Sequence, residues 1–153
     1  MTQCTSTPSP TTPAELKTLY PYQFAGKSIE LSFMRGWFSL FANTCRQVDD
    51  ILGEDKRGFH WIQLKEKFGS ARWYWTITDK ARKADPDLNR RLMQLVADGT
   101  AKTDTACIAC GSPGELDTHG GYHLVLCPTH AEQRKVEPES MQIIWLDDNT
   151  PGV

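Results

Sequence analysis

The feature that most constrains this chain is a set of paired metal-ligand residues in its C-terminal third. Cys107 and Cys110 form a Cys-x2-Cys pair, and Cys127 and His130 form a Cys-x2-His pair after sixteen intervening residues. Zinc in proteins takes four sulfur or nitrogen ligands in a tetrahedron, and two such pairs supply two ligands each. We therefore predict a Zn²⁺ site with these four residues as its ligands.

The residues around the two pairs predict the local structure of a treble-clef-like zinc finger. Gly111 follows the first pair and permits a tight turn that points amide N–H groups at the sulfur atoms. Two adjacent glycines at 120–121 predict the turn of a hairpin, with a returning strand over 122–126. Pro128 suits the first turn of a helix that continues through 131–135. A knuckle, a hairpin and a helix in this order are typical of a treble clef.

The fourth ligand has two alternatives, because His119 and His123 lie in the same stretch of chain. We favour His130 for its spacing from Cys127. With four protein ligands no coordination position is left for water or substrate, which indicates a structural rather than a catalytic metal. The free energy of metal binding would then contribute directly to folding.

Composition and length limit the location and class of the protein. The chain has 153 residues and a net charge of −2, which does not suit a general nucleic-acid binder. No apolar run approaches the roughly 18 residues of a membrane span, and the N-terminus lacks a secretory signal. We expect a cytoplasmic protein without a membrane partner, in a compartment where cysteines stay reduced and bind metals.

Hydrophobic periodicity predicts the elements upstream of the finger. Residues 36–52 place apolar side chains at three- and four-residue spacing, which indicates an amphipathic helix. Residues 59–78 predict a β-hairpin with its connection at 65–70, and with Ile62 and Leu64 on one face of the first arm. A second helix begins at Pro86 after the N-cap residue Asp85 and runs to 98, with a continuation towards 104.

These elements predict an α+β fold, in which a small antiparallel sheet with packed helices carries a C-terminal treble-clef-like zinc finger. Residues 1–15 are rich in Thr, Ser and Pro and predict a disordered tail. The α+β core then spans 16–104 and the zinc finger 105–137. Residues 138–153 predict a C-terminal strand, at 141–146, and a loose tail.

Three motifs together resemble a family of small uncharacterised proteins encoded by bacteriophages and prophages. They are Gly36-Trp37-Phe38, the KEKFG hairpin at 65–69 followed by Arg72-Trp73-Tyr74, and the Cys-x2-Cys-Gly and Cys-x2-His finger. Ala71 departs from the pattern, which has a larger aliphatic residue there. The resemblance implies a phage accessory protein in the host cytoplasm, acting against host defences or regulating phage genes, and it implies no catalytic role.

The charge is unevenly distributed, and this suggests two binding modes. Residues 56–91 contain ten Lys or Arg and four Asp or Glu, whereas residues 107–153 contain two basic and seven acidic residues. The basic hairpin also carries four aromatic rings that could stack on bases. The alternative, which we favour, is that these rings form the core, since strand alternation buries most of them. The rings are those of Trp61, Trp73, Tyr74 and Trp75.

The acidic C-terminal segment contains Trp145 among aliphatic residues, which suits either docking to a basic protein or an edge strand of the core. The residues that we select for partner binding are Lys65, Lys67, Arg72 and Trp145.

The chain shows no second His/Asp cluster, nucleophile motif or phosphate loop. We predict a non-enzymatic zinc protein that binds a host defence or regulatory protein. The alternatives are nucleic-acid binding by 56–91 and a metal-dependent hydrolase.

Overall fold

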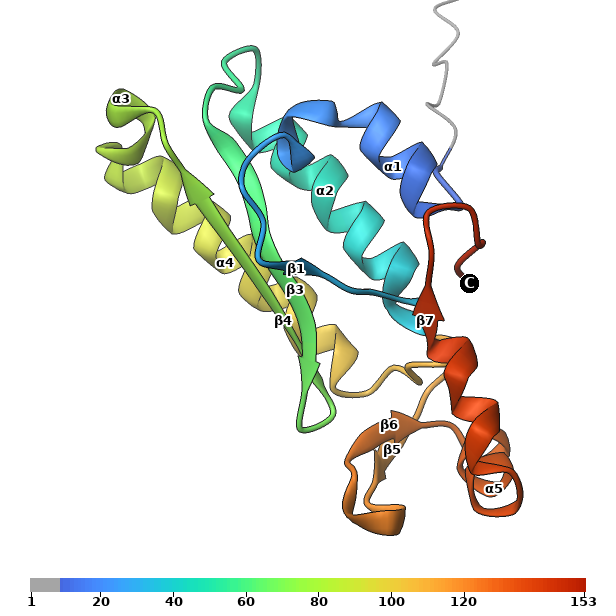
Figure 1. Cartoon of the computed structure of the whole chain (residues 1–153). Helices are drawn as coiled ribbons and strands as arrows, with labels where there is room; N and C mark the ends of the chain where they lie inside the picture. Colours follow the sequence, from blue (N-terminus) through green and yellow to red (C-terminus); the bar gives the residue numbers. More distant parts are fainter. Residues whose placement is uncertain (1–8) are drawn as a thin grey trace, which may run out of the picture.

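The computed structural model of this chain describes residues 9–153 and confirms the predicted α+β class (Figure 1). A three-stranded sheet in the order β1-β3-β4 packs against helices α2 and α4, and the Cys/His finger lies beyond the tip of its hairpin. The strands of this sheet are β1 (Glu30–Leu31), β3 (Phe59–Lys67) and β4 (Ser70–Ile77). The helices of the core are α1 (Pro13–Leu19), η1 (Pro21–Phe24), η2 (Arg35–Trp37), α2 (Phe38–Leu52), α3 (Lys80–Lys83) and α4 (Pro86–Thr103).

The β3–β4 hairpin is tighter than the sequence predicts. The strands extend to Lys67 and Ser70, so only Phe68 and Gly69 connect them instead of the expected loop over 65–70. Both turn residues have positive φ angles, 54° and 87°, which the twist of a two-residue hairpin favours. Lys65 and Lys67 consequently belong to a strand and not to a loop.

A β-bulge changes the face to which the residues of β3 point. Trp61 pairs with Trp75 and Gln63 pairs with Tyr74, so Ile62 is the extra residue between them. Leu64 is therefore buried on the same side as Trp61, while Ile62 is only half-buried. The regular alternation that we predicted for Ile62 and Leu64 is interrupted by this bulge, because one extra residue shifts the side chains beyond it to the opposite face.

Aromatic packing joins the sheet to the helices. The ring of Phe41 on α2 lies 5.0 Å from the Trp61 ring and 5.1 Å from the Trp73 ring, measured between centroids. Helix α4 continues to Thr103, as the sequence suggests, and passes close to α2 at Gly99. A Cβ atom there would lie 2.7 Å from the Thr44 hydroxyl, so only glycine allows this approach of the two helices.

The N- and C-terminal segments are more ordered than predicted. Residues 1–8 of the expected disordered tail lie outside the described residues, but 13–15 form the first turn of α1. Thr12 caps this helix through its side chain, which accepts a hydrogen bond from the Glu15 amide. The C-terminal segment packs beside it, with Asp148 accepting bonds from the Ala14 amide at 2.9 Å and the Lys17 ammonium at 2.8 Å.

The apolar segment 141–146 is mostly helical and not the single strand that we predicted. Helix η4 (Pro138–Ile144) is a 3₁₀ helix, and only β7 (Trp145–Leu146) is a strand, which pairs antiparallel with β2 (Phe33–Met34). Met141 and Ile144 are both buried, and their three-residue spacing matches the period of a 3₁₀ helix.

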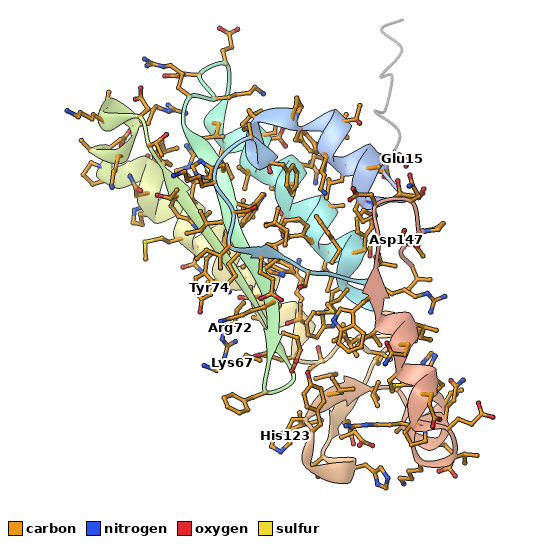
Figure 2. All side chains as sticks on the ribbon, viewed as in Figure 1. Glu15, Lys67, Arg72, Tyr74, His123 and Asp147 are labelled. Atoms are coloured by element: carbon orange, nitrogen blue, oxygen red, sulfur yellow. The ribbon has the colours of Figure 1, made fainter. Side chains whose placement is uncertain are left out.

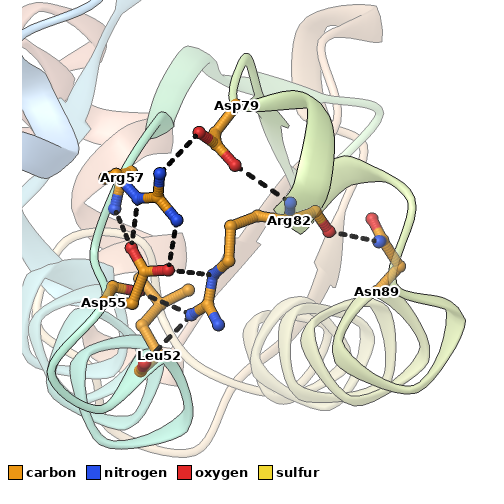
Figure 3. Close-up of polar contacts among 6 residues, drawn as sticks. All are labelled: Leu52, Asp55, Arg57, Asp79, Arg82 and Asn89. Carbon is orange, nitrogen blue, oxygen red and sulfur yellow. Dashed lines mark hydrogen bonds and ion pairs between the residues drawn. The ribbon is translucent and has the colours of Figure 1, made fainter.

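An ion-pair network ties the end of α2 to the start of α3 (Figure 3). The Arg82 guanidinium donates to the carbonyls of Leu52 and Asp55, and Arg57 bridges the carboxylates of Asp55 and Asp79. Hydrogen bonds from Arg57 hold the pKa of the Asp55 carboxyl below its usual range. Within the 56–91 stretch, the network thus pairs Arg57 and Arg82 with acidic residues.

Across residues 9–153 no helix combines the length and apolar character needed to cross a membrane.

Candidate metal centre

The four predicted ligands converge on one point, with all their ligand atoms within 4.8 Å of one another. The Sγ atoms of Cys110 and Cys127 are 3.8 Å apart. The Nδ1 atom of His130 lies 3.6 Å from Cys107 Sγ and 3.2 Å from Cys127 Sγ. Around a tetrahedral zinc ion, two sulfurs lie about 3.8 Å apart, and a sulfur and a nitrogen about 3.5 Å apart. The cluster could therefore hold a metal ion such as zinc, with His130 binding through Nδ1.

The separations also show that these cysteines are thiols. A disulfide needs two sulfurs about 2.05 Å apart, which none of the pairs in the cluster approaches. Burial raises the pKa of the Cys107 thiol to about 11. Burial also acts on Cys110, but hydrogen bonds from Ser112 and the neighbouring cysteines outweigh it and lower the pKa of this thiol to about 6. A bound cation would favour the thiolate form of all three cysteines.

The first pair of ligands lies on a tight knuckle. The Gly111 amide donates to the Cys107 carbonyl at 2.7 Å, and Gly111 has a φ of 77°, the left-handed conformation that glycine permits. The Ile108 amide donates to the Val125 carbonyl at 2.9 Å, which joins the knuckle to the strand before Cys127. The predicted role of Gly111 as a turn residue is confirmed.

The second pair of ligands follows a short hairpin and begins a helix. Strands β5 (Glu115–Asp117) and β6 (Leu124–Leu126) are joined through η3 (His119–Gly121), and β6 is shorter than the predicted 122–126. Cys127 is the N-cap residue of α5 (Pro128–Val136), so His130 lies in its first turn. The order of knuckle, hairpin and helix is the predicted one.

The two alternative histidines do not join the cluster. His119 is exposed in η3, and His123 is half-buried, with its ring centroid 6.5 Å from that of Phe68. His130 is the histidine that lies with the three cysteines, at the position that its spacing indicated.

The knuckle is held against the core by residues that precede α2. The Gly36 amide donates to the Ile108 carbonyl at 2.7 Å, and the Trp37 indole donates to the Ala106 carbonyl at 2.8 Å. A Cβ atom on Gly36 would lie 2.0 Å from the Cys107 carbonyl oxygen, so the contact requires glycine. The contact of Trp37 with the knuckle was not predicted, because no local pattern indicates a contact with a segment 69 residues further along the chain.

The predicted partner-binding residues lie on two different sheets. Lys65 and Arg72 are cross-strand neighbours on the β3–β4 hairpin, with Lys67 further towards its tip. Trp145 belongs to the β2–β7 pair and is 47% exposed. They therefore form no single surface.

The aromatic residues of the hairpin belong mainly to the core. Trp61 and Trp73 are buried, and the ring of Trp75 stacks on that of Phe59 at 5.6 Å between centroids. The preferred core interpretation is confirmed for Trp61 and Trp73, whereas Tyr74 is exposed.

The resemblance to a phage family stays a prediction. Comparisons of the chain with protein-family models, curated proteins and solved structures found no match.

Proposed function

We propose that this chain is a non-enzymatic accessory protein, stabilised by structural zinc, that acts by binding another protein through its C-terminal third. The observation that carries the proposal is a hollow of about 340 Å³ between the finger and the η4–β7 segment. Two aromatic side chains at this hollow are half-exposed, Tyr122 at 52% and Trp145 at 47%. Half-exposed aromatic rings beside a hollow are typical anchors of protein interfaces.

Zinc has a structural role in this proposal. The finger supplies four ligands itself, so the ion has no open position for a substrate. The ion would hold the β5–β6 hairpin and α5 in place, and through them Tyr122 on one side of the hollow. Loss of the ion would therefore weaken partner binding without any loss of chemistry at the metal.

The charge around the hollow favours a basic partner. Glu137 and Glu139 are exposed at the start of η4, which forms one wall of the hollow. The basic residue at the hollow, Arg134, is already paired with Asp117 at 2.8 Å. Two exposed glutamates next to an apolar hollow suit a partner segment that carries Lys or Arg beside an apolar anchor.

The proposal includes a bacteriophage accessory role, with a host defence or regulatory protein as the partner. Its support is the set of family-like motifs, whose Gly36-Trp37 pair holds the finger against the core. Reduced thiols at the metal centre suit action in the host cytoplasm.

The test is capture from a bacterial host lysate with the zinc-loaded full chain. We expect a stoichiometric host protein whose affinity falls about tenfold or more with Trp145→Ala or Tyr122→Ala, because interface aromatics carry much of the binding energy. Met93→Ala is the matched control, since Met93 is an exposed apolar residue on α4, away from the hollow. Recovery of no stoichiometric protein, or equal loss with the control, would contradict the proposal.

A further inference from the structure

The outer face of the β3–β4 hairpin is a second surface, distinct from the C-terminal hollow. Phe41 and Gly99 pack on Trp73, so α2 and α4 cover the face to which Trp73 points. Side chains alternate along a strand, so Arg72 and Tyr74 point to the opposite face. In Figure 2 Tyr74, Arg72 and Lys67 follow one another along the hairpin towards its tip. We call this surface, made of Lys65, Lys67, Arg72 and Tyr74, the outer hairpin face.

Positive charge on this face is balanced only in part, because Glu30 of β1 lies in register with Gln63 on the same side of the sheet. Lys65 lies directly opposite Arg72 in the strand register, and like charges in this arrangement destabilise a sheet. Among residues 9–153, neither these two residues nor Lys67 forms an ion pair within 4.0 Å. Glu66, between the two lysines, is directed elsewhere and accepts a hydrogen bond from the Tyr122 hydroxyl at 2.8 Å.

The basic residues nearest in sequence differ from this group. Lys56 pairs with Asp49, and Arg57 pairs with both Asp55 and Asp79. The ion-pair network of Figure 3 thus neutralises charge at the far end of the sheet, where β3 begins and β4 ends. Within the described residues, Lys80, Lys83 and Arg91 also form no ion pair, but they lie on helices α3 and α4. Lys65, Lys67 and Arg72 instead lie together on the outer hairpin face, where an anionic ligand would offset their charge.

Exposed aromatic rings accompany the charges. Tyr74 is 45% exposed, and the Lys65 ammonium lies 5.9 Å from the centre of its ring. Phe68 is 72% exposed at the tip of the turn and has a φ of 54°, a conformation that bulky residues seldom adopt. Asn or Gly would form this turn at lower backbone cost. The Phe68 ring contacts the His123 ring at 6.5 Å and the Lys67 ammonium at 5.6 Å, and these contacts leave most of it exposed.

We propose that the outer hairpin face binds single-stranded nucleic acid. Lys65, Lys67 and Arg72 would contact phosphates, while Tyr74 and Phe68 would stack on unpaired bases. Bases are free to stack on protein rings in single strands, whereas in a duplex they stack on one another. An acidic peptide would satisfy the charges but would leave the two exposed rings without a role. The proposal is independent of the protein-binding hollow.

The experiment is a fluorescence-anisotropy titration of the zinc-loaded full chain with a labelled oligothymidylate of about 15 nucleotides. We expect a complex that weakens as salt rises, because phosphate contacts release counterions. The double variant Lys65→Gln/Arg72→Gln should bind more weakly. It should also reduce the slope of log affinity against log salt by about 0.7 for each lost phosphate contact, about 1.4 in total.

The matched control is Lys80→Gln/Lys83→Gln, which removes the same charge from exposed residues of α3. We expect this control to keep most of the affinity. Tyr74→Leu should weaken binding about tenfold and leave the salt slope unchanged, because it removes a stacking ring but no charge. Trp145→Ala should bind the oligonucleotide like wild type, which separates this proposal from the protein-binding one. Circular dichroism and zinc content show that each variant is folded.

Three results would overturn the proposal. One is the absence of any salt-dependent complex with wild type. Another is equal loss of affinity in the α3 control and the hairpin variant, which would show non-specific attraction. The third is equal binding of polyglutamate together with no effect of Tyr74→Leu, which would point to an acidic peptide as the ligand.

Discussion

The finger and the helix-backed sheet are stabilised by different means. In the sheet region, buried rings of Phe41, Trp61 and Trp73 pack against one another. In the finger, two strands of three residues and one short helix surround a Cys₃His cluster. Strands this short bury too little apolar surface to be stable alone. The apolar residues of the finger are nevertheless buried, so a bound metal would add to hydrophobic packing there and not replace it.

The two regions share buried apolar residues, among them Ile108, Leu124 and Leu126 of the finger, and hydrogen bonds also join them. The Gly36 amide and the Trp37 indole donate hydrogen bonds to carbonyls of the knuckle, and the Arg35 guanidinium donates to the Ala109 carbonyl at 2.7 Å. Because the finger contacts the core, we expect metal binding to affect the stability of the core as well. The size of this effect can be measured.

Metal removal should have the largest effect. Structural zinc contributes about 10–16 kcal/mol of apparent binding free energy in small fingers, so a strong chelator should unfold residues 105–137. Hydrogen exchange should show lost protection in β6 and α5, with protection retained in α2 and α4. Unchanged exchange in the finger would contradict a metal-dependent fold, while equal loss in the helices would show that the regions unfold together.

Phe41→Ala should destabilise the core and leave the metal affinity of the finger unchanged. Removal of a buried ring costs about 3–5 kcal/mol, because it leaves a cavity between α2 and the sheet. We expect a lower denaturation midpoint for the core but unchanged metal affinity in competition with a chromophoric chelator. Ser39→Ala, an exposed change on the same helix, is the control. A comparable loss of metal affinity would refute the distinction between the regions.

Gly36→Ala tests the contact between the regions. The added methyl group would collide with the Cys107 carbonyl, and such overpacking costs about 1–3 kcal/mol. We expect both lower stability and weaker metal binding. The same substitution at Gly99 crowds Thr44 and Trp73 inside the core, so Gly99→Ala should lower stability alone. If both variants gave the same pattern, the Gly36 contact would not be specific to the knuckle.

Asp55→Asn should have the smallest effect, at the end of the core far from the finger. The pKa of Asp55 is lowered in the folded protein, so its ionised form stabilises the fold above the unfolded pKa of about 3.9. This contribution is lost as the pH falls through the lower folded value. The difference in thermal midpoint between wild type and variant should therefore be largest near neutral pH and shrink in acid. A difference that grows in acid would contradict this sign.

The sequence by itself determined the features that depend on near neighbours along the chain. Paired spacing identified the four residues of the Cys₃His cluster, because two residues on one turn present their side chains close together. The N-cap residue Asp85 and the following Pro86 located the start of α4, because helix capping also depends only on adjacent residues. The alternation of the hairpin was sufficient to bury Trp73 but not to locate the bulge at Ile62.

Only the tertiary structure decided the features that depend on distant segments. The first residues of α1, 13–15, are ordered where composition indicated disorder, because the C-terminal segment supplies partners for this helix. In segment 141–146 the buried residues Met141 and Ile144 are three residues apart, as in a 3₁₀ helix. A continuous apolar run in the sequence does not show which of its residues will be buried. The role of Gly36 depends on a knuckle some 70 residues further along the chain. Such contacts have no local pattern, because they arise only when the folded chain brings the two surfaces together.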